Sequence, residues 1–174
     1  GRFFLFIGMA GRKLSHHDFQ ERHRGGLFGS SICNLKGDVN MTKLNVIEGI
    51  GPTYEAKLVE AGIKSIEDLL EKGATKEGRA AIAEKTEISD KLVLRWINHA
   101  DLMRVKGVRG EYSELLEASG VDTIPELAQR KAANLYAKMV AVNEEKKLVR
   151  KLPTEAQVAN WVEQAKALGR MIKY

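Results

Sequence analysis

The 174-residue chain contains one cysteine and three prolines, only 6% of its residues are aromatic, and it has no long run of apolar side chains. A single cysteine cannot form an internal disulfide and provides no cysteine framework for a structural metal. A membrane-spanning helix needs about 20 consecutive, mainly apolar residues, and the apolar stretch at 3–7 is far shorter. These absences favour a cytoplasmic protein without a membrane span, a disulfide or a metal site.

Sequence motifs of common enzyme classes are also missing. The chain has no glycine-rich nucleotide loop that ends in Lys-Ser/Thr, no zinc-ligand spacing and no nucleophile elbow. His99 is the only histidine after residue 40, and no serine, cysteine or pair of carboxylates frames it as a general base. We therefore expect a protein that is not an enzyme and that needs no cofactor.

Residues 1–40 differ in composition from the rest of the chain. They contain all five phenylalanines, the cysteine, and more than half of the net charge of +5. Glycines interrupt this leader, so we expect an irregular segment. Our hypothesis is that Met41 is the native start and that the leader is translated upstream sequence or was added for expression; the alternative is a mobile tail. Its histidines lack the ordered spacing of a metal site: His16, His17 and His23.

After Met41, one pattern occurs twice, as Gly-Ile-Gly-Pro-Thr-Tyr at 49–54 and as Gly-Val-Arg-Gly-Glu-Tyr at 107–112. Identical residues recur at one constant offset: Gly49/Gly107, Tyr54/Tyr112, Leu58/Leu116, Gly62/Gly120, Ile66/Ile124 and Leu69/Leu127. A tryptophan on an apolar helical face follows each copy, Trp96 and then Trp161, and both are expected in the core. The repeat predicts a tandem duplication of one helical unit, with modules at 41–104 and 105–174.

The capping signals of these modules predict an all-α fold. Apolar residues recur at helical spacing, and no alternating run typical of a strand is present. Three segments are predicted to begin helices, each with a side chain three residues later that reaches back to the cap: those at Ser65, Thr123 and Thr154. Three glycines are predicted to end helices at the C-terminal cap: Gly62, Gly73 and Gly120.

The first glycine pair predicts a tight hairpin between two helices. We expect a short helix to end at Glu48, a turn at 49–51 with Ile50 pointing inward, and a new helix that Pro52 opens. Glycine at 49 and 51 permits a turn that a Cβ would strain. Backbone N–H groups beside a helix N-terminus favour an anion, and a nucleic-acid phosphate is suitable.

The residues Ile47-x-Gly49-Ile50-Gly51-Pro52-x3-Ala56-x-Leu58 resemble the helix-hairpin-helix motif of DNA-repair and recombination proteins. The continuation through 58–69 resembles the helical C-terminal domain of bacterial RNA polymerase alpha. Over 41–174 the order of repeats and tryptophan helices is similar to a bacterial family of tandem helix-hairpin-helix proteins of unknown function. This resemblance implies that the glycine hairpins contact DNA phosphates of the minor-groove side without reading sequence.

The second hairpin, at 107–109, departs from this motif, because Arg109 and Gly110 replace Gly51 and Pro52. We expect a shifted turn that uses Gly107 and Gly110, with a local excess of positive charge. The candidate nucleic-acid-binding residues are Gly49, Ile50, Gly51, Lys57, Arg104, Lys106, Gly107, Val108, Arg109 and Gly110. The alternative is that both hairpins only pack helices together, and that the chain is a helical module for protein–protein interaction.

Overall fold

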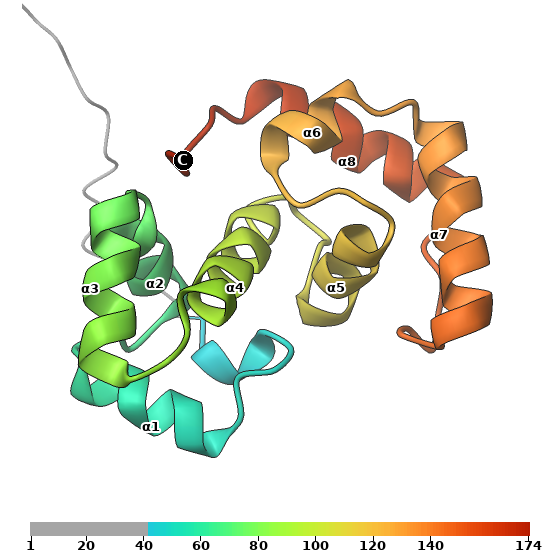
Figure 1. Cartoon of the computed structure of the whole chain (residues 1–174). Helices are drawn as coiled ribbons and strands as arrows, with labels where there is room; N and C mark the ends of the chain where they lie inside the picture. Colours follow the sequence, from blue (N-terminus) through green and yellow to red (C-terminus); the bar gives the residue numbers. More distant parts are fainter. Residues whose placement is uncertain (1–41) are drawn as a thin grey trace, which may run out of the picture. The chain divides into compact units, whose positions relative to one another are not determined.

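The computed structural model describes residues 42–174, which fold entirely into helices and turns without a strand (Figure 1). The all-α prediction is therefore confirmed for this range, whereas the predicted leader, its histidines and Met41 lie outside the described residues. The helical elements are η1 (Leu44–Val46, a 3-10 turn), α1 (Pro52–Glu60), α2 (Ile66–Gly73), α3 (Lys76–Thr86), α4 (Asp90–Leu102), α5 (Gly110–Ala118), α6 (Ile124–Gln129), α7 (Ala132–Lys146) and α8 (Glu155–Ala167).

The predicted N-caps are confirmed, because each hydroxyl accepts a hydrogen bond from the backbone N–H three residues later. Only Thr154 has the complete reciprocal arrangement, in which the Gln157 side chain accepts from the Thr154 N–H at 2.8 Å. Asp68 and Glu126 instead accept from the N–H of the residue before the cap, at 3.0 and 2.9 Å. The backbone N–H of the residue before the cap also has no partner within the helix. The hydrogen bond that we expected at the cap N–H is therefore made one residue earlier in the chain.

The helices end at or just before all three predicted glycines. Gly62 and Gly120 follow α1 and α5 with φ values of +83° and +81°, which a glycine adopts without strain. Gly73 is different: it is the buried last residue of α2, and a Cβ there would overlap the side chain of Ile97 on α4. Gly73 is therefore needed for close packing of α2 on α4. The helix ends at Gly73 as predicted, but Ala74 occupies the C-cap position.

The helices enclose two hydrophobic cores. The first contains buried side chains from η1 to α4, and the second contains those from the end of α4 to α8. Trp96 is buried in the first core and Trp161 in the second, as expected. Each indole packs against a tyrosine of the helix after the hairpin, with centroid distances of 5.2 Å for Tyr54–Trp96 and 5.4 Å for Tyr112–Trp161.

The two cores do not divide cleanly at the predicted module boundary between residues 104 and 105. Leu102, the last residue of α4, contributes to the second core. The segment after α8 runs back toward α2 and α3 (Figure 1) and places Ile172 in the first core, where 1% of its surface is exposed. Beside it, the Lys173 N–H donates to the carbonyl oxygen of Ala74 at 2.8 Å.

Candidate nucleic-acid interface

The first hairpin connects η1 to α1. Its backbone places Gly49 at φ +89°, and the Ile50 N–H donates to the Ile47 carbonyl at 3.1 Å, which directs the buried Ile50 inward. The short helix expected to end at Glu48 is only a 3-10 turn that ends at Val46, because Ile47 is already extended. Gly51 has φ −83° and ψ 175°, and a Cβ there would meet no atom within 4 Å beyond its neighbours. Only Gly49 needs to be glycine for the turn.

The second hairpin has the same backbone geometry. Gly107 has φ +96°, and the Val108 N–H donates to the Val105 carbonyl at 3.0 Å. Arg109 occupies the N-cap position of α5 in an extended conformation, as Gly51 does at the start of α1. The expected shifted turn was therefore wrong, because position 109 does not require a positive φ and accepts a side chain without strain.

The two helix N-termini differ in how open they are. Gly110, the first residue of α5, is buried, and a Cβ there would overlap the backbone carbonyl oxygen of Val46. The segment before the first hairpin thus covers the start of α5, and Gly110 serves packing. The start of α1 at Gly51 is not covered in this way, although Glu55 in its first turn opposes an anion.

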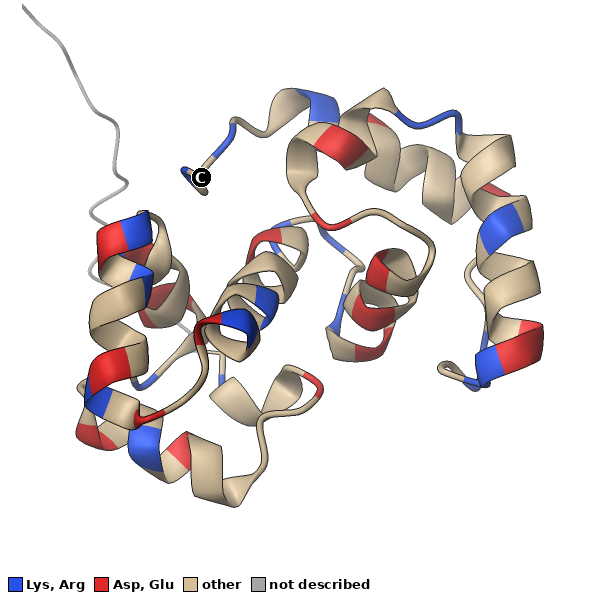
Figure 2. Ribbon diagram, in the orientation of Figure 1, with Lys and Arg blue, Asp and Glu red and all other residues tan. Residues whose placement is uncertain are grey.

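A groove of about 490 Å³ lies between this covering segment and the second hairpin. It is lined by Thr42, Lys43, Val46 and residues 103–109. We call it the basic groove, because the lining has no carboxylate and contains the positive side chains of Lys43, Arg104, Lys106 and Arg109. In Figure 2, basic residues lie before α5, whereas the helix itself carries acidic ones. The structure therefore brings the predicted residues of the second hairpin, except Gly110, together around one cavity.

The cations of the basic groove are not equally available. Arg104 is held by Asp101, at 2.6 Å, and by the Gly169 carbonyl oxygen, at 3.2 Å. Within residues 42–174, no ion pair engages Lys43, Lys106 or Arg109. Lys106 is fixed through its backbone instead, since its N–H donates to Oε1 of Gln164 at 2.9 Å and its carbonyl accepts from Nε2 at 3.3 Å. The loop of the second hairpin is thus anchored to α8 and presents Lys106 and Arg109, which have no ion pair within residues 42–174.

The model of one protein family, the domain of unknown function DUF4332, matches residues 48–168, which is more than half of the chain. The chain belongs to the DUF4332 family. The matched range includes both hairpins and α1–α8, but it begins after Lys43 and ends before the C-terminal segment that reaches the first core. Neither the curated proteins nor the solved structures include a match to this chain.

Two lysines of this DUF4332 protein lie differently from the sequence-based prediction. Lys57, a predicted site residue, is in the last turn of α1 and forms an ion pair with Glu87 at 3.6 Å, and it does not line the basic groove. Lys43 does line the groove but was missed as a site residue. Lys43 belongs to no local sequence motif. Only the folded structure brings it into the same groove lining as Lys106 and Arg109.

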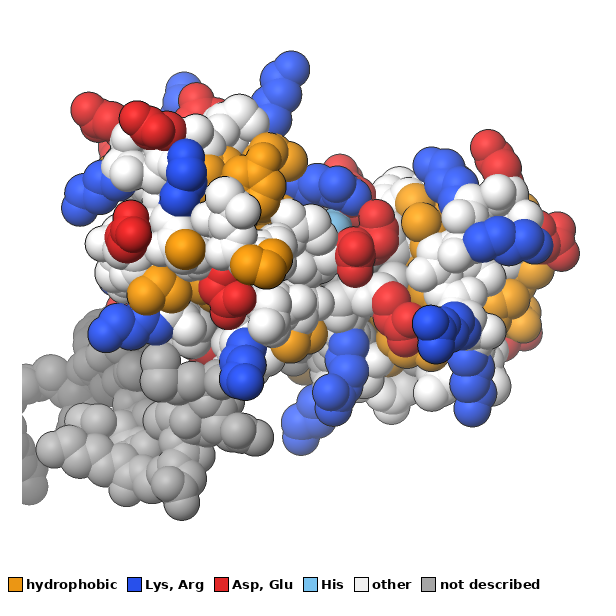
Figure 3. Space-filling model, turned by 90° about the horizontal axis from the view of Figure 1, so that it is seen from below, with side chains coloured by type: hydrophobic (Ala, Val, Ile, Leu, Met, Phe, Trp, Pro, Cys, Tyr) orange, Lys and Arg blue, Asp and Glu red, His pale blue; other side chains and the backbone are white. Residues whose placement is uncertain are grey.

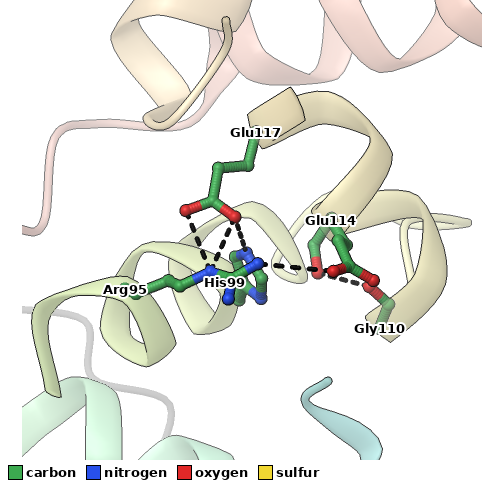
Figure 4. A network of polar contacts seen from close by, with 6 residues as sticks. Arg95, His99, Gly110, Glu114 and Glu117 are labelled. Carbon is green, nitrogen blue, oxygen red and sulfur yellow. Dashed lines mark hydrogen bonds and ion pairs between the residues drawn. The ribbon is translucent and has the colours of Figure 1, made fainter. Parts of the chain in front are cut away.

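On the face seen from below, the DUF4332 protein shows acidic and basic side chains interspersed (Figure 3). Figure 4 shows a partly buried network in which Arg95 and His99 of α4 point toward Glu114 and Glu117 of α5. Arg95 contacts Glu117 at 2.8 Å and Glu114 at 3.3 Å, and Nε2 of His99 lies 3.0 Å from Glu117. Burial lowers the pKa of His99 despite the Glu117 carboxylate. The network joins the two core-forming regions.

Residues 42–174 contain no group of three or more His, Cys, Asp or Glu side chains placed to hold a metal ion. Among the helices of this range, none has the length and apolar character needed to cross a membrane. The strongest candidate site in the described DUF4332 fold is therefore the basic groove, with the open start of α1 near it in the chain.

Proposed function

We propose that this protein is a non-catalytic nucleic-acid-binding protein, and that its basic groove holds the phosphate backbone of DNA. The observation that carries the proposal is the convergence of Lys43, Lys106 and Arg109 on one groove whose lining has no carboxylate. These side chains come from two distant segments and have no ion-pair partner within residues 42–174. Each cation that meets a phosphate releases counterions and so adds salt-dependent affinity.

The proposed architecture is a tandem pair of helix-hairpin-helix modules that arose by duplication. Its support is the matched geometry of the two hairpins, including positive φ at Gly49 and Gly107 and the inward turn of Ile50 and Val108. The tyrosine–tryptophan contacts also match between the two halves. Contacts to phosphates position a protein on nucleic acid without reading bases, so the binding we propose is not sequence-specific.

The two hairpins contribute differently to the proposed interface. The second hairpin and Lys43 supply the positive charge, whereas the start of α5 is covered by Val46. The first hairpin supplies the uncovered N-terminus of α1, whose leading backbone N–H groups have no intrahelical partner. Val46 lies both in the segment before the first hairpin and in the lining of the basic groove. This proximity favours contact of a single DNA backbone with both hairpins.

Fluorescence anisotropy with a short labelled duplex, recorded over a salt series, tests this proposal. The informative variant is Lys106→Gln/Arg109→Gln, and the matched control is Lys146→Gln/Arg150→Gln, which removes the same two charges from exposed positions outside the groove. We expect the groove variant to reduce the slope of log affinity against log salt by about 2, and the control to leave it nearly unchanged. Equal effects of the two variants would contradict groove binding.

The alternative function is a helical module for protein–protein interaction, in which both hairpins are structural. Apolar docking loses little affinity with added salt, whereas phosphate contacts lose much. The absence of duplex binding at low salt would overturn the nucleic-acid proposal and favour this alternative.

A further inference from the structure

We infer that the start of α7 is a second anion site, separate from the basic groove, that takes a phosphate group. The inference does not rest on the proposed function. A cavity of about 260 Å³ adjoins this helix end, and its lining residues are Ser119, Gln129, Arg130, Lys131, Asn134, Leu135 and Lys138. The lining contains three positive side chains and no negative one.

The N-terminus of α7 lacks the capping found at the start of α3. Lys131 occupies the N-cap position without a side-chain hydrogen bond, and the first turn has no acidic residue. At the start of α3, Thr75 accepts from the Gly78 N–H at 3.1 Å, and Glu77 lies in the first turn. A helix N-terminus carries partial positive charge and unpaired N–H groups, so a lysine there is unfavourable unless an anion binds.

A buried hydroxyl at the same cavity points independently to a ligand. Ser119 is 2% exposed and lines the cavity, yet its Oγ has no hydrogen-bond partner among the described residues. Only one other buried side-chain atom of residues 42–174, Nδ1 of His99, is in this condition. An unpaired buried hydroxyl is costly. A rotation of the Ser119 side chain toward the cavity would let this hydroxyl donate to an oxygen of a bound anion.

The cations around the cavity divide into one that is fixed and two that are available. A guanidinium N–H of Arg130 donates to the Gly120 carbonyl oxygen at 2.6 Å, which holds this side chain beside the loop. Lys131 and Lys138 have no ion pair within the described range. Nζ of Lys138 also lies near Gly120, 3.3 Å from the position that a Cβ would take there.

This combination suits a phosphate group. Its oxygens accept several charge-assisted hydrogen bonds at once, from lysine ammonium groups, from the N–H groups that open α7 and from the serine hydroxyl. The chemistry is the same for inorganic phosphate, for the phosphate of a small molecule and for a nucleic-acid backbone. The experiment therefore separates the site from the source of its phosphate.

Nuclear magnetic resonance of the full chain tests the site with inorganic phosphate as the probe. At constant ionic strength, we expect saturable shifts of the backbone amide signals of Ala132, Ala133 and Asn134. Lys131→Thr introduces the cap that Thr75 provides in α3, and Lys138→Gln removes a cation; each is expected to weaken phosphate binding about tenfold. Lys146→Gln, at the other end of α7, is the matched control and should leave the affinity unchanged.

Ser119→Ala provides a test that does not depend on charge. It removes a hydroxyl that has no partner, so thermal stability should not fall, while the phosphate affinity should decrease several-fold. Shifts that do not saturate at the start of α7 would overturn the inference. An affinity that is the same in Lys138→Gln, Lys131→Thr and Lys146→Gln would also overturn it.

A second arm identifies the source of the phosphate and keeps this site distinct from the basic groove. Arg109→Gln should leave the phosphate-induced shifts of α7 unchanged, whatever it does to duplex binding; their loss would contradict a separate site. If Lys138→Gln also weakens duplex binding, the site takes backbone phosphate. If only inorganic phosphate binding is weakened, the site takes a small phosphate, and this outcome supports the inference even where the protein binds no duplex.

Discussion

The indole of Trp161 lies against Gly107, so that a Cβ at this glycine would come within 3.1 Å of Nε1. The same relationship holds in the first half of the fold, where the corresponding distance from Gly49 to Trp96 is 3.4 Å. Each hairpin is thus shaped by two constraints, a positive φ and a tryptophan beneath it. The tryptophan helices are therefore part of what holds the hairpins in place.

Gly107→Ala is expected to destabilise the protein by about 1–3 kcal/mol, because alanine is strained at φ +96° and its methyl group would press on Trp161. Gly51→Ala is the matched control. Its extended backbone and open surroundings accept a Cβ, so the change should be neutral or stabilise by up to about 1 kcal/mol. Urea unfolding measures both, and equal destabilisation would contradict the different roles of these glycines.

Lys43→Gln should weaken duplex binding as much as Arg109→Gln does, with the salt slope reduced by about 1 in each variant. Both side chains line the basic groove. Lys57→Gln should have almost no effect on binding, because Lys57 is paired with Glu87 away from the groove. Fluorescence anisotropy of the three variants over a salt series measures these duplex affinities. A larger loss of affinity in Lys57→Gln than in the other two variants would place the interface on α1 instead.

The elements that the sequence predicts well are those that depend on neighbouring residues. Pro52 opens α1, Thr154 caps α8, and Gly49 adopts a positive φ, because each role follows from local backbone chemistry. The motif predicts that the turn needs glycine at both 49 and 51. In the structure only Gly49 has a conformation that requires glycine. Sequence alone shows which residue types are present, but not the φ value that each one adopts.

The features that the sequence did not predict depend on contacts between distant segments. A Cβ at Gly110 would overlap the carbonyl oxygen of Val46, and a Cβ at Gly73 would overlap the side chain of Ile97, so both positions need glycine. Lys43 joins the basic groove only when the segment before the first hairpin packs on α5. The repeat revealed the equivalent hairpins, but it contains no information on how one half packs against the other.

Ile172→Ala is expected to destabilise the protein by about 2–4 kcal/mol, because it leaves a cavity in the first core. Met171→Ala is the matched control. Its side chain is 37% exposed, and its truncation should change stability by less than about 0.5 kcal/mol. Hydrogen exchange should show faster opening of α2 and α3 in Ile172→Ala, since Lys173 and its neighbours are anchored at Ala74 and Arg79. Unchanged exchange there would contradict this anchoring.

His99 should make the stability of the protein fall as the pH is lowered from about 7 toward 5. Burial lowers its pKa in the folded state below the usual 6.5, so the unfolded chain binds a proton more readily than the folded one. The stabilising contribution of the neutral form is complete above the unfolded pKa and is lost as the pH falls through it and on to the folded pKa. The loss is at most about 1.4 kcal/mol per pH unit.

The charged groups that face His99 are Arg95 on its own helix and Glu117 and Glu114 on α5. His99→Gln should therefore flatten the dependence of unfolding free energy on pH in this range, whatever it does to the stability at pH 8. Urea unfolding at several pH values measures the slope for both proteins. A variant slope as steep as that of the parent would show that another group carries the effect, and that the α4–α5 network is not pH-sensitive through His99.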